Sequence, residues 1–479
     1  MSVRSIQGMK GDVRDVGFNN LMRLKTKLSL ATVLVIVASQ GACVRAYLDA
    51  DTDADEVAEA VLSSSNSQHI HEFSMYDWHA ERLPQNLMTY CQALVESGAP
   101  IPASLRQPNA PFHVAEFSRA YFMLLNGSAR ESVEIFAELT KDENHSVWGI
   151  VGLLEVAVYT RNITSMRGFL DRMRDLKERD GMLAQTFSYY ALHYEFHIAN
   201  YDNAQRILNE IELRAESLLM QVHLLVRENR FGDAQRHIDL MAKLPELQGR
   251  AFIIMAQAEI LAVQYGYEKS TKFLNRMSAK FPEMWQLRLL YAIHLTGLER
   301  QGPREIAAQT LLSLVDTRKH DIAMRLIVIN VLLDLRAYDK AGMLINGLPR
   351  ALNEFYYYNL VLAKLDSLMG DLNSRHANLS KARAMFPMEP DGLWFAYRIS
   401  ALNGDYQGAI TVLNTLLSVD PHDQYVLASL AQSYVAIEQW QEAQAIATSV
   451  LQSNRYLDVK LRNEMRELRS RAAATSPPP

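Results

Sequence analysis

The chain has few of the residues on which several classes of protein depend. Only two of its 479 residues are cysteines, which excludes a disulfide scaffold and any metal site built wholly from cysteine. Glycine (21) and proline (15) are scarce, and since both disfavour helix interiors, their scarcity favours long helices. Neither sign of charge dominates, because 49 Lys and Arg stand against 54 Asp and Glu. Binding to nucleic acid phosphates needs a positive excess, so nucleic acid is not an expected partner.

The sequence also lacks the short motifs that carry common chemistries. No glycine-rich phosphate loop, no GxSxG nucleophile turn and no Cys–His nucleophile pattern occurs. About half of the residues are apolar (49%), which excludes a wholly disordered chain. The length exceeds one ordinary core and predicts several domains or an array of repeats. We therefore expect a folded protein that is not an enzyme and has no cofactor and no small-molecule substrate.

Residues 22–43 have the layout of a secretory signal peptide. A basic stretch (residues 23–27) precedes an apolar run (residues 28–39), which is short for a membrane span of about 20 residues. Because the segment ends on Cys43, it resembles a bacterial lipoprotein signal, in which the cysteine is acylated and becomes the new N-terminus. It departs from that pattern at Gln40, where an aliphatic residue is usual. Residues 1–21 fit no signal, so Met22 is a candidate start.

This resemblance implies an address in the cell envelope. The protein would face the periplasm, anchored by acyl chains on Cys43, and Val44 in place of an aspartate after the cysteine favours the outer membrane. Residues 44–56 are rich in acidic side chains and would form a solvated tether. An uncleaved signal-anchor over residues 28–44 and simple secretion remain alternatives. A disulfide between Cys43 and Cys91 competes with acylation; without it, Cys91 is expected to be buried as a small apolar residue.

Residues 113–457 repeat with a period near 34. Successive small or otherwise equivalent positions, here called anchors, are 30 to 38 residues apart, and the last four gaps are each 34. The residues four and seven positions after every anchor are apolar, and an aromatic residue stands three positions before six of the anchors. Spacings of three, four and seven place these positions on one face of a helix. The anchors are Ser132, Met166, Ala204, Ala234, Ser270, Ala307, Ala341, Arg375, Ala409 and Ala443.

This pattern resembles the tetratricopeptide repeat, a helix–turn–helix unit of 34 residues. Residues 403–421 and 438–451 are the nearest matches to it. The resemblance implies an all-α fold, an α-solenoid that forms a right-handed superhelix of about ten such repeats. Each unit would complete its core only by stacking on its neighbours.

Three segments flank the predicted array. Residues 57–112 are expected to form an N-terminal helical cap and a proline-rich linker, with four prolines in residues 97–111. Residues 458–472 carry an apolar stripe at Leu461, Met465 and Leu468 and are expected to form a capping helix. The tail, residues 473–479, is expected to be disordered.

Two groups of histidines are candidate metal ligands. His69, His71 and His79 lie in one polar stretch, but Met75 stands where a helical zinc motif beginning at His71 needs its second histidine. His193 and His197 are four residues apart on a helix, with no third ligand nearby, so hydrogen bonds between helices are the expected use. Glu195 is a candidate partner for one of them. We therefore expect no metal, although an envelope metallohydrolase that uses one of these groups is the alternative function.

In the tetratricopeptide family the first helix of each unit lines a concave groove that binds partners. Tyr, Trp and Arg dominate many interfaces, and Lys364 and Arg398 would recognise acidic groups. The resemblance thus implies a non-catalytic scaffold of the cell envelope that binds a peptide or helix of another envelope protein, in pilus, secretion or outer-membrane assembly. A regulator or chaperone with the same groove is a further alternative. Counting back from the anchors predicts groove positions at Leu326, Asn330, Tyr357, Leu360, Lys364, Trp394, Arg398, Tyr425 and Gln432.

Overall fold

The structure is a computed structural model that describes residues 87–88, 91, 112–142, 145–177, 181–211, 215–243, 251–282, 284–298, 300–317, 321–349 and 352–475. Every regular element in these ranges is an α-helix, which confirms the all-α prediction. The helices of the first half are α8 (Phe112–Leu125), α9 (Ala129–Leu139), α10 (Ser146–Thr160), α11 (Ile163–Lys177), α12 (Gly181–His197), α13 (Tyr201–Glu210), α14 (Ala215–Arg227), α15 (Phe231–Met241), α16 (Ala251–Tyr265), α17 (Tyr267–Lys280), α18 (Trp285–Thr296) and α19 (Gln301–Thr317).

The second half continues the same alternation and ends on an unpaired helix. Its helices are α20 (Ile322–Asp334), α21 (Tyr338–Asn346), α22 (Tyr356–Met369), α23 (Leu372–Met385), α24 (Pro390–Leu402), α25 (Tyr406–Val419), α26 (Gln424–Ala436), α27 (Trp440–Gln452) and α28 (Val459–Thr475). None of the helices that the structure describes is both long and apolar enough to span a bilayer.

The helices pair as the repeat pattern predicts. All ten anchors lie in the second helix of a pair, α9 through α27, and all ten are buried. Two serine anchors show how close the paired helices approach: the hydroxyl of Ser132 donates to the carbonyl of Ala120, and that of Ser270 to the carbonyl of Ala258, each at 2.7 Å. A small anchor lets the two backbones approach this closely, so the fold is an α-solenoid of stacked helical pairs.

The recurring aromatic residues and prolines mark the ends of the second helices. Each of the six aromatics is the first residue of its helix, as Tyr201 is of α13 and Trp440 is of α27. Pro282, Pro387 and Pro421 follow the ends of α17, α23 and α25 by two residues, where a ring without an N–H cannot continue a helix. The periodicity of the sequence therefore locates both ends of these elements.

The predicted flanks are only partly described. Residues 22–43, the acidic tether at 44–56 and most of 57–111 lie outside the described residues, but Leu87, Met88 and Cys91 are buried in the main core. Burial raises the pKa of the Cys91 thiol to about 12, opposed by a hydrogen bond with Ser118, so this cysteine packs as predicted. The capping helix is α28, whose Met465 is buried; it continues through residues 473–475, which the sequence placed in the tail.

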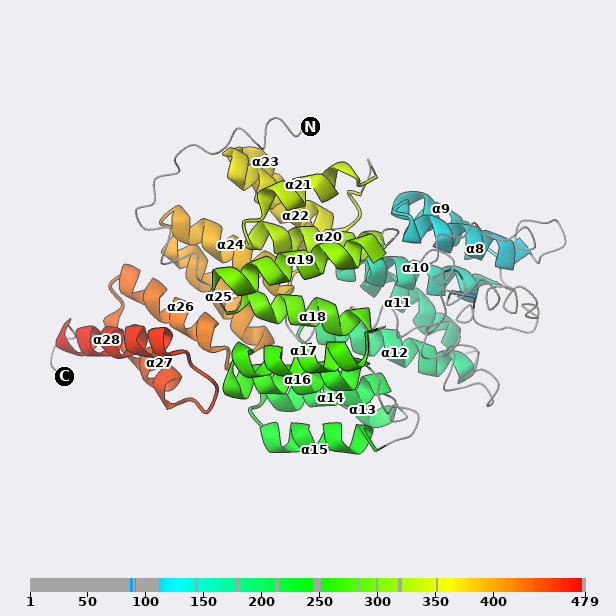
Figure 1. Cartoon of the computed structure of the whole chain (residues 1–479). Coiled ribbons are helices and arrows are strands. Elements are labelled where there is room, and N and C mark those ends of the chain that lie inside the picture. Colours follow the sequence, from blue (N-terminus) through cyan, green and yellow to red (C-terminus); the bar gives the residue numbers. More distant parts are fainter. Residues whose placement is uncertain are drawn as a thin grey trace.

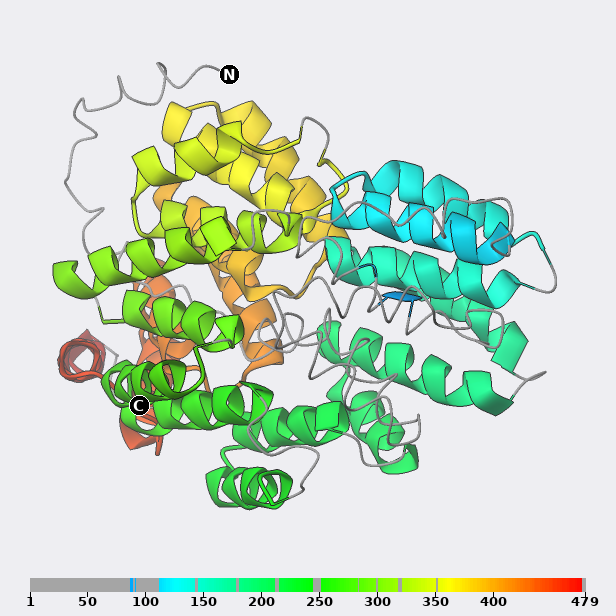
Figure 2. The ribbon, with the colours of Figure 1, turned by 45° about the vertical axis from the view of Figure 1, so that its right-hand side comes forward.

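The pairs form a path that returns on itself. In Figure 1 they run from α8 and α9 down to α14 and α15, then up through α16–α19 to α20–α23, and α24–α28 descend again. Figure 2 shows the orange helices near residues 390–450 between the green and the teal helices of the first half. The second half of the solenoid thus packs against the first half.

Candidate functional site

Seven of the nine predicted groove residues are buried inside the protein. Arg398 keeps 22% of its side chain exposed, and only Gln432 is exposed to solvent. The buried seven are Leu326, Asn330, Tyr357, Leu360, Lys364, Trp394 and Tyr425.

Tyr357 lies in a buried polar network that joins the two halves. Its hydroxyl accepts a hydrogen bond from Arg161 Nη1 at 2.8 Å and lies 3.3 Å from Glu389 Oε1 and 3.2 Å from Asp391 Oδ2. Asn330 Nδ2 donates to the same Asp391 oxygen at 3.1 Å. Burial, reinforced by the charge of Glu389, raises the pKa of Asp391 to about 7. Two predicted groove residues, Tyr357 and Asn330, are therefore occupied by contacts within the chain.

Lys364 and Arg398 bind an acidic group, but that group is the protein's own. Both oxygens of Asp334, at the end of α20, accept from Lys364 Nζ at 2.7 Å, and one accepts from Arg398 Nη2 at 3.3 Å. Burial tends to raise the pKa of Asp334, yet attraction to the two cations outweighs it and the pKa is lowered. The prediction that these cations recognise an acidic partner is thus unsupported in this conformation, because Asp334 already pairs with both of them.

Trp394 and Tyr425 face a cavity of about 110 Å³ between the halves. The first half contributes His223, Arg227 and Tyr267 to its wall. The hydroxyl of Tyr425 also lies 3.2 Å from Asp458 Oδ2, in the loop before α28. Both aromatic residues therefore pack where the halves meet rather than on an open surface.

The line of contact between the halves, residues 161–266 against residues 357–456, is here called the seam. At the seam, helix C-termini of one half face those of the other. The last four carbonyls of a helix have no partner within it and carry partial negative charge. Arginine, tyrosine and threonine side chains from the opposite half donate to these carbonyls, so the seam adds hydrogen bonds to the helix ends of each half.

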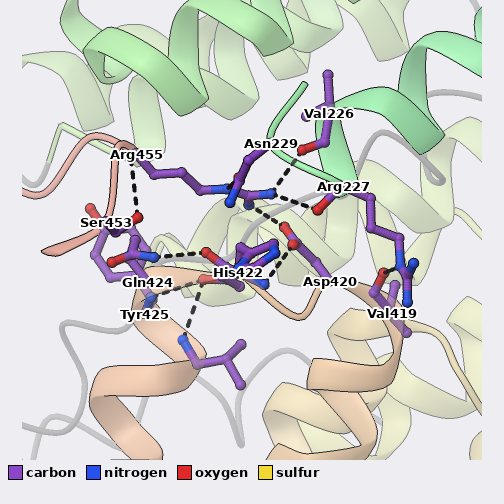
Figure 3. A network of polar contacts seen from close by, with 12 residues as sticks. Val226, Arg227, Asn229, Val419, Asp420, His422, Gln424, Tyr425, Ser453 and Arg455 are labelled. Atoms are coloured by element: carbon purple, nitrogen blue, oxygen red, sulfur yellow. Dashed lines mark hydrogen bonds and ion pairs between the residues drawn. The ribbon is translucent and has the colours of Figure 1, made fainter. Parts of the chain in front are cut away.

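Arg455, in the loop after α27, makes the densest set of these contacts (Figure 3). Its Nη2 donates to the carbonyl of Val226 at 2.9 Å, its Nε to Asn229 Oδ1 at 2.6 Å, and its Nη1 to Asp420 Oδ2 at 2.6 Å. Only 3% of its side chain is exposed. The ends of α14 and α25 are therefore held together by one guanidinium group from the last repeat.

Equivalent contacts recur along the seam at the period of the repeat. Thr164 Oγ1 donates to the carbonyl of Ala384 at the end of α23, at 2.7 Å. The carbonyl of Val419, at the end of α25, accepts from Tyr201 Oη at 3.1 Å and from Arg227 Nε at 3.2 Å. Successive helix ends of the second half thus accept hydrogen bonds from successive side chains of the first half.

The last contact of the seam is made by the backbone. Tyr456 N donates to the carbonyl of Val263, near the end of α16, at 2.8 Å. Gly266 lies against the Tyr456 ring with a positive φ of 86°, and a Cβ atom there would approach the ring to 2.8 Å. Glycine is needed for both reasons, because other residues rarely adopt this φ and none could fit the space.

The seam explains why the predicted groove is not open. Periodicity identified the inward-facing positions of the first helices, and the structure buries seven of the nine. The superhelix then closes, so the inward faces of α20–α26 contact each other and the first half. An open concave groove at these residues is wrong for this conformation.

The candidate metal ligands do not form a metal site in the described ranges. His69, His71 and His79 lie outside the described residues. His197 packs edge-on against Phe386 with ring centroids 5.2 Å apart, and its Nδ1 has no hydrogen bond in the described part of the chain. Within that part, no three His, Cys, Asp or Glu side chains gather closely enough to hold a metal ion. The expected hydrogen bonds between helices are thus replaced, at His197, by a ring contact.

Glu195 does not pair with either histidine. Its Oε2 accepts from Asn200 Nδ2 at 2.7 Å, in the turn that follows α12. A buried carboxyl that the sequence did not identify lies nearby: Glu155 accepts a hydrogen bond from Tyr190 Oη at 2.5 Å. Burial raises the pKa of Glu155 to about 7, and the Tyr190 hydrogen bond opposes part of that rise. Its only signal in the sequence is a charge within the otherwise apolar α10.

One exposed cleft lies at the C-terminal end of the array, and Gln432 is part of it. Apolar side chains, among them the half-buried Trp440 and the buried Met465, form much of its wall, and charged residues of α28 line the rest. Its volume is about 230 Å³. We name it the C-terminal cleft; it is lined by Gln432, Val435, Trp440, Glu464, Met465, Glu467, Leu468 and Arg471.

The helices beside this cleft match a known family. Residues 401–455, which contain α25, α26 and α27, match the model of the tetratricopeptide repeat. This part of the chain is similar to the tetratricopeptide repeat. The chain is also similar to one in the crystal structure of the APC/C hetero-tetramer Cut9–Hcn1, at 12% identity and a TM-score of 0.41, over 86% of this chain and 74% of that one. No curated protein matches it.

Proposed function

We propose that the protein is a non-catalytic scaffold of the bacterial cell envelope that binds a segment of another envelope protein in the C-terminal cleft. The observation that carries the proposal is that the cleft lies between the matched repeat and α28 and contains Gln432, the one predicted groove position that is exposed. Repeats of this kind bind other proteins. Anchoring through an acylated Cys43 belongs to the proposal and rests on the lipoprotein-like segment 22–43.

The residues that line the cleft indicate which kind of partner segment would fit it. A half-buried tryptophan among apolar side chains, with a charged rim, is the arrangement in which binding energy concentrates at interfaces. Glu464 and Glu467 lie on the rim, and Glu464 already pairs with Lys460 at 3.4 Å. The partner segment is therefore a helix or extended peptide with a large apolar side chain beside a basic residue.

The experiment places a photo-crosslinking amino acid at position 432 in cells and identifies the envelope protein that it captures. A peptide of the captured segment is then titrated against purified protein by calorimetry. Trp440→Ala should weaken binding at least tenfold, or about 1.4 kcal/mol, with unchanged circular dichroism. Leu372→Ala is the control, because Leu372 is an exposed apolar residue (58%) on α23 and lies outside the C-terminal cleft. A loss below threefold for Trp440→Ala, or equal losses for both variants, would contradict the cleft as the site.

A further inference from the structure

Two histidine rings are buried in the seam without full hydrogen bonding. His197, the last residue of α12, contacts Phe386 from the loop after α23, and His223 on α14 lines the cavity that contains Trp394. They are 5% and 9% exposed. In the described part of the chain, the Nδ1 atom of each has no hydrogen-bond partner. A proton added to either ring would therefore be a buried charge with no acceptor at hand.

The permanent charges that face these rings are those of arginines. His197 is near His193 on its own helix, Arg161 at the end of α10 and His223. His223 faces Arg227 on its own helix and Arg455 from the loop after α27.

The carboxylates in the same cavity already have partners. Asp420 accepts from Arg455 Nη1, Glu259 lies 3.0 Å from His294 Nε2, and Asp423 accepts from the backbone N–H of Tyr425 at 2.9 Å. His422, in the loop after α25, also faces Arg455, and burial together with that cation lowers its pKa. None of these carboxylates is placed to neutralise a protonated His197 or His223.

We infer that the seam is a pH-sensitive closure, which opens in mild acid and exposes the inward faces of α22, α24 and α26. The closed conformation requires His197 and His223 to be neutral, whereas the open conformation hydrates them. Tyr357 and Trp394, which the sequence assigned to a binding groove, lie on the faces that opening would uncover.

The direction in which the open–closed equilibrium shifts with pH follows from the pKa of each histidine in the two conformations. Burial first, then the neighbouring cations, lowers the pKa of His197 well below its ordinary value and that of His223 to about 3. A hydrated histidine has a pKa near 6.5, so the open state takes up protons below about pH 6.5 and the closed state does not. Each histidine thus raises the ratio of open to closed protein about tenfold between pH 7.5 and 5.5. By the same arithmetic Asp391, whose pKa is about 7 in the closed state, favours closure about 25-fold over this range, which leaves a net shift of about fourfold toward the open state.

The test measures the radius of gyration of the full chain by small-angle X-ray scattering at pH 7.5 and 5.5. The wild type should expand reversibly at pH 5.5 while its circular dichroism keeps the helical signal. The double variant His197→Gln, His223→Gln should stay compact at both values. His376→Gln, which changes an exposed histidine on α23, is the control and should expand like the wild type. Arg455→Ala should be expanded already at pH 7.5.

Hydrogen–deuterium exchange of the wild type tests the same inference without any variant. After correction for the intrinsic rate, peptides covering residues 418–424 and 453–458 should lose protection at pH 5.5 more than α18 and α19 do. A wild type that stays compact at pH 5.5, a double variant that still expands, or uniform loss of protection and helicity would overturn the proposal. The C-terminal cleft plays no part in these measurements, so they are independent of the proposed binding site.

Discussion

Arg455 and Asn229 are 226 positions apart in the chain, and Arg455 Nε donates to Asn229 Oδ1 over 2.6 Å. Arg455 lies in the loop after the tenth described helical pair, and Asn229 lies in the turn that joins the helices of the fourth. A solenoid whose repeats contact only their neighbours has no such contact. The pair therefore shows that this array has a long-range interface in addition to its stacking.

Replacing Arg455 tests how much that interface contributes to the free energy of unfolding. Arg455→Ala removes a side-chain donor from the carbonyl of Val226, which still accepts from the N–H of Asn229, and removes the cation that pairs with the partly buried Asp420. We expect a loss of about 3–5 kcal/mol in the free energy of unfolding, measured by urea denaturation at pH 7.5. Arg455→Lys keeps the charge and should recover part of the loss. A loss below about 1 kcal/mol for Arg455→Ala would show that the seam contributes little.

The buried pair of Lys364 and Asp334 allows a sharper comparison. Lys364→Ala leaves Asp334 with Arg398 as its remaining cation and should cost about 3–5 kcal/mol of unfolding free energy. The double variant Lys364→Met, Asp334→Leu removes the buried pair and should lose less than Lys364→Ala does, although the partly exposed Arg398 then has no carboxylate partner. Equal losses in the single and double variants would indicate that packing, and not charge, matters at this site.

Glu155 predicts a specific dependence of stability on pH. Its pKa is about 7 in the folded protein and about 4.5 when hydrated, so the folded state holds the proton more tightly. Its contribution is fully present below about pH 4.5 and is lost as the pH rises through 7. Glu155→Gln does not titrate, so its unfolding free energy should gain about 2 kcal/mol relative to the wild type between pH 5.5 and pH 8. Urea denaturation at the two values measures this, and parallel pH profiles would refute it.

Cys43→Ser tests the proposed anchor. Acyl chains bind a bilayer by burying about 0.8 kcal/mol per methylene, so the wild type should sediment with membranes and the variant should not. Cys91→Ser is the control, because Cys91 is a buried free thiol and its change should leave the protein in the membrane fraction. Cys43→Ser that still sediments with membranes would favour the signal-anchor alternative, and a wild type found free of membranes would favour simple secretion.

The binding site was harder to predict than the repeats, for a physical reason. Which face of a helix points inward depends on local spacing, and the positions of Tyr357 and Trp394 were correct in that sense. Whether an inward face stays open depends on how far the superhelix turns before its own loops meet it. That angle sums small rotations over many repeats, and no short motif encodes the sum.

Local periodicity in the amino-acid sequence was enough to determine the helices, their pairing, the buried anchors such as Ala409 and the proline-marked ends. These properties follow from side chains three, four and seven positions apart, which interact whatever the rest of the chain does. The tertiary structure alone decided that Arg161, Arg227 and Arg455 bridge helix ends of opposite halves and that Lys364 binds Asp334. The arginine contacts join residues 192 to 229 positions apart and form only once the two halves meet, whereas Lys364 and Asp334, 30 positions apart, meet when neighbouring repeats stack.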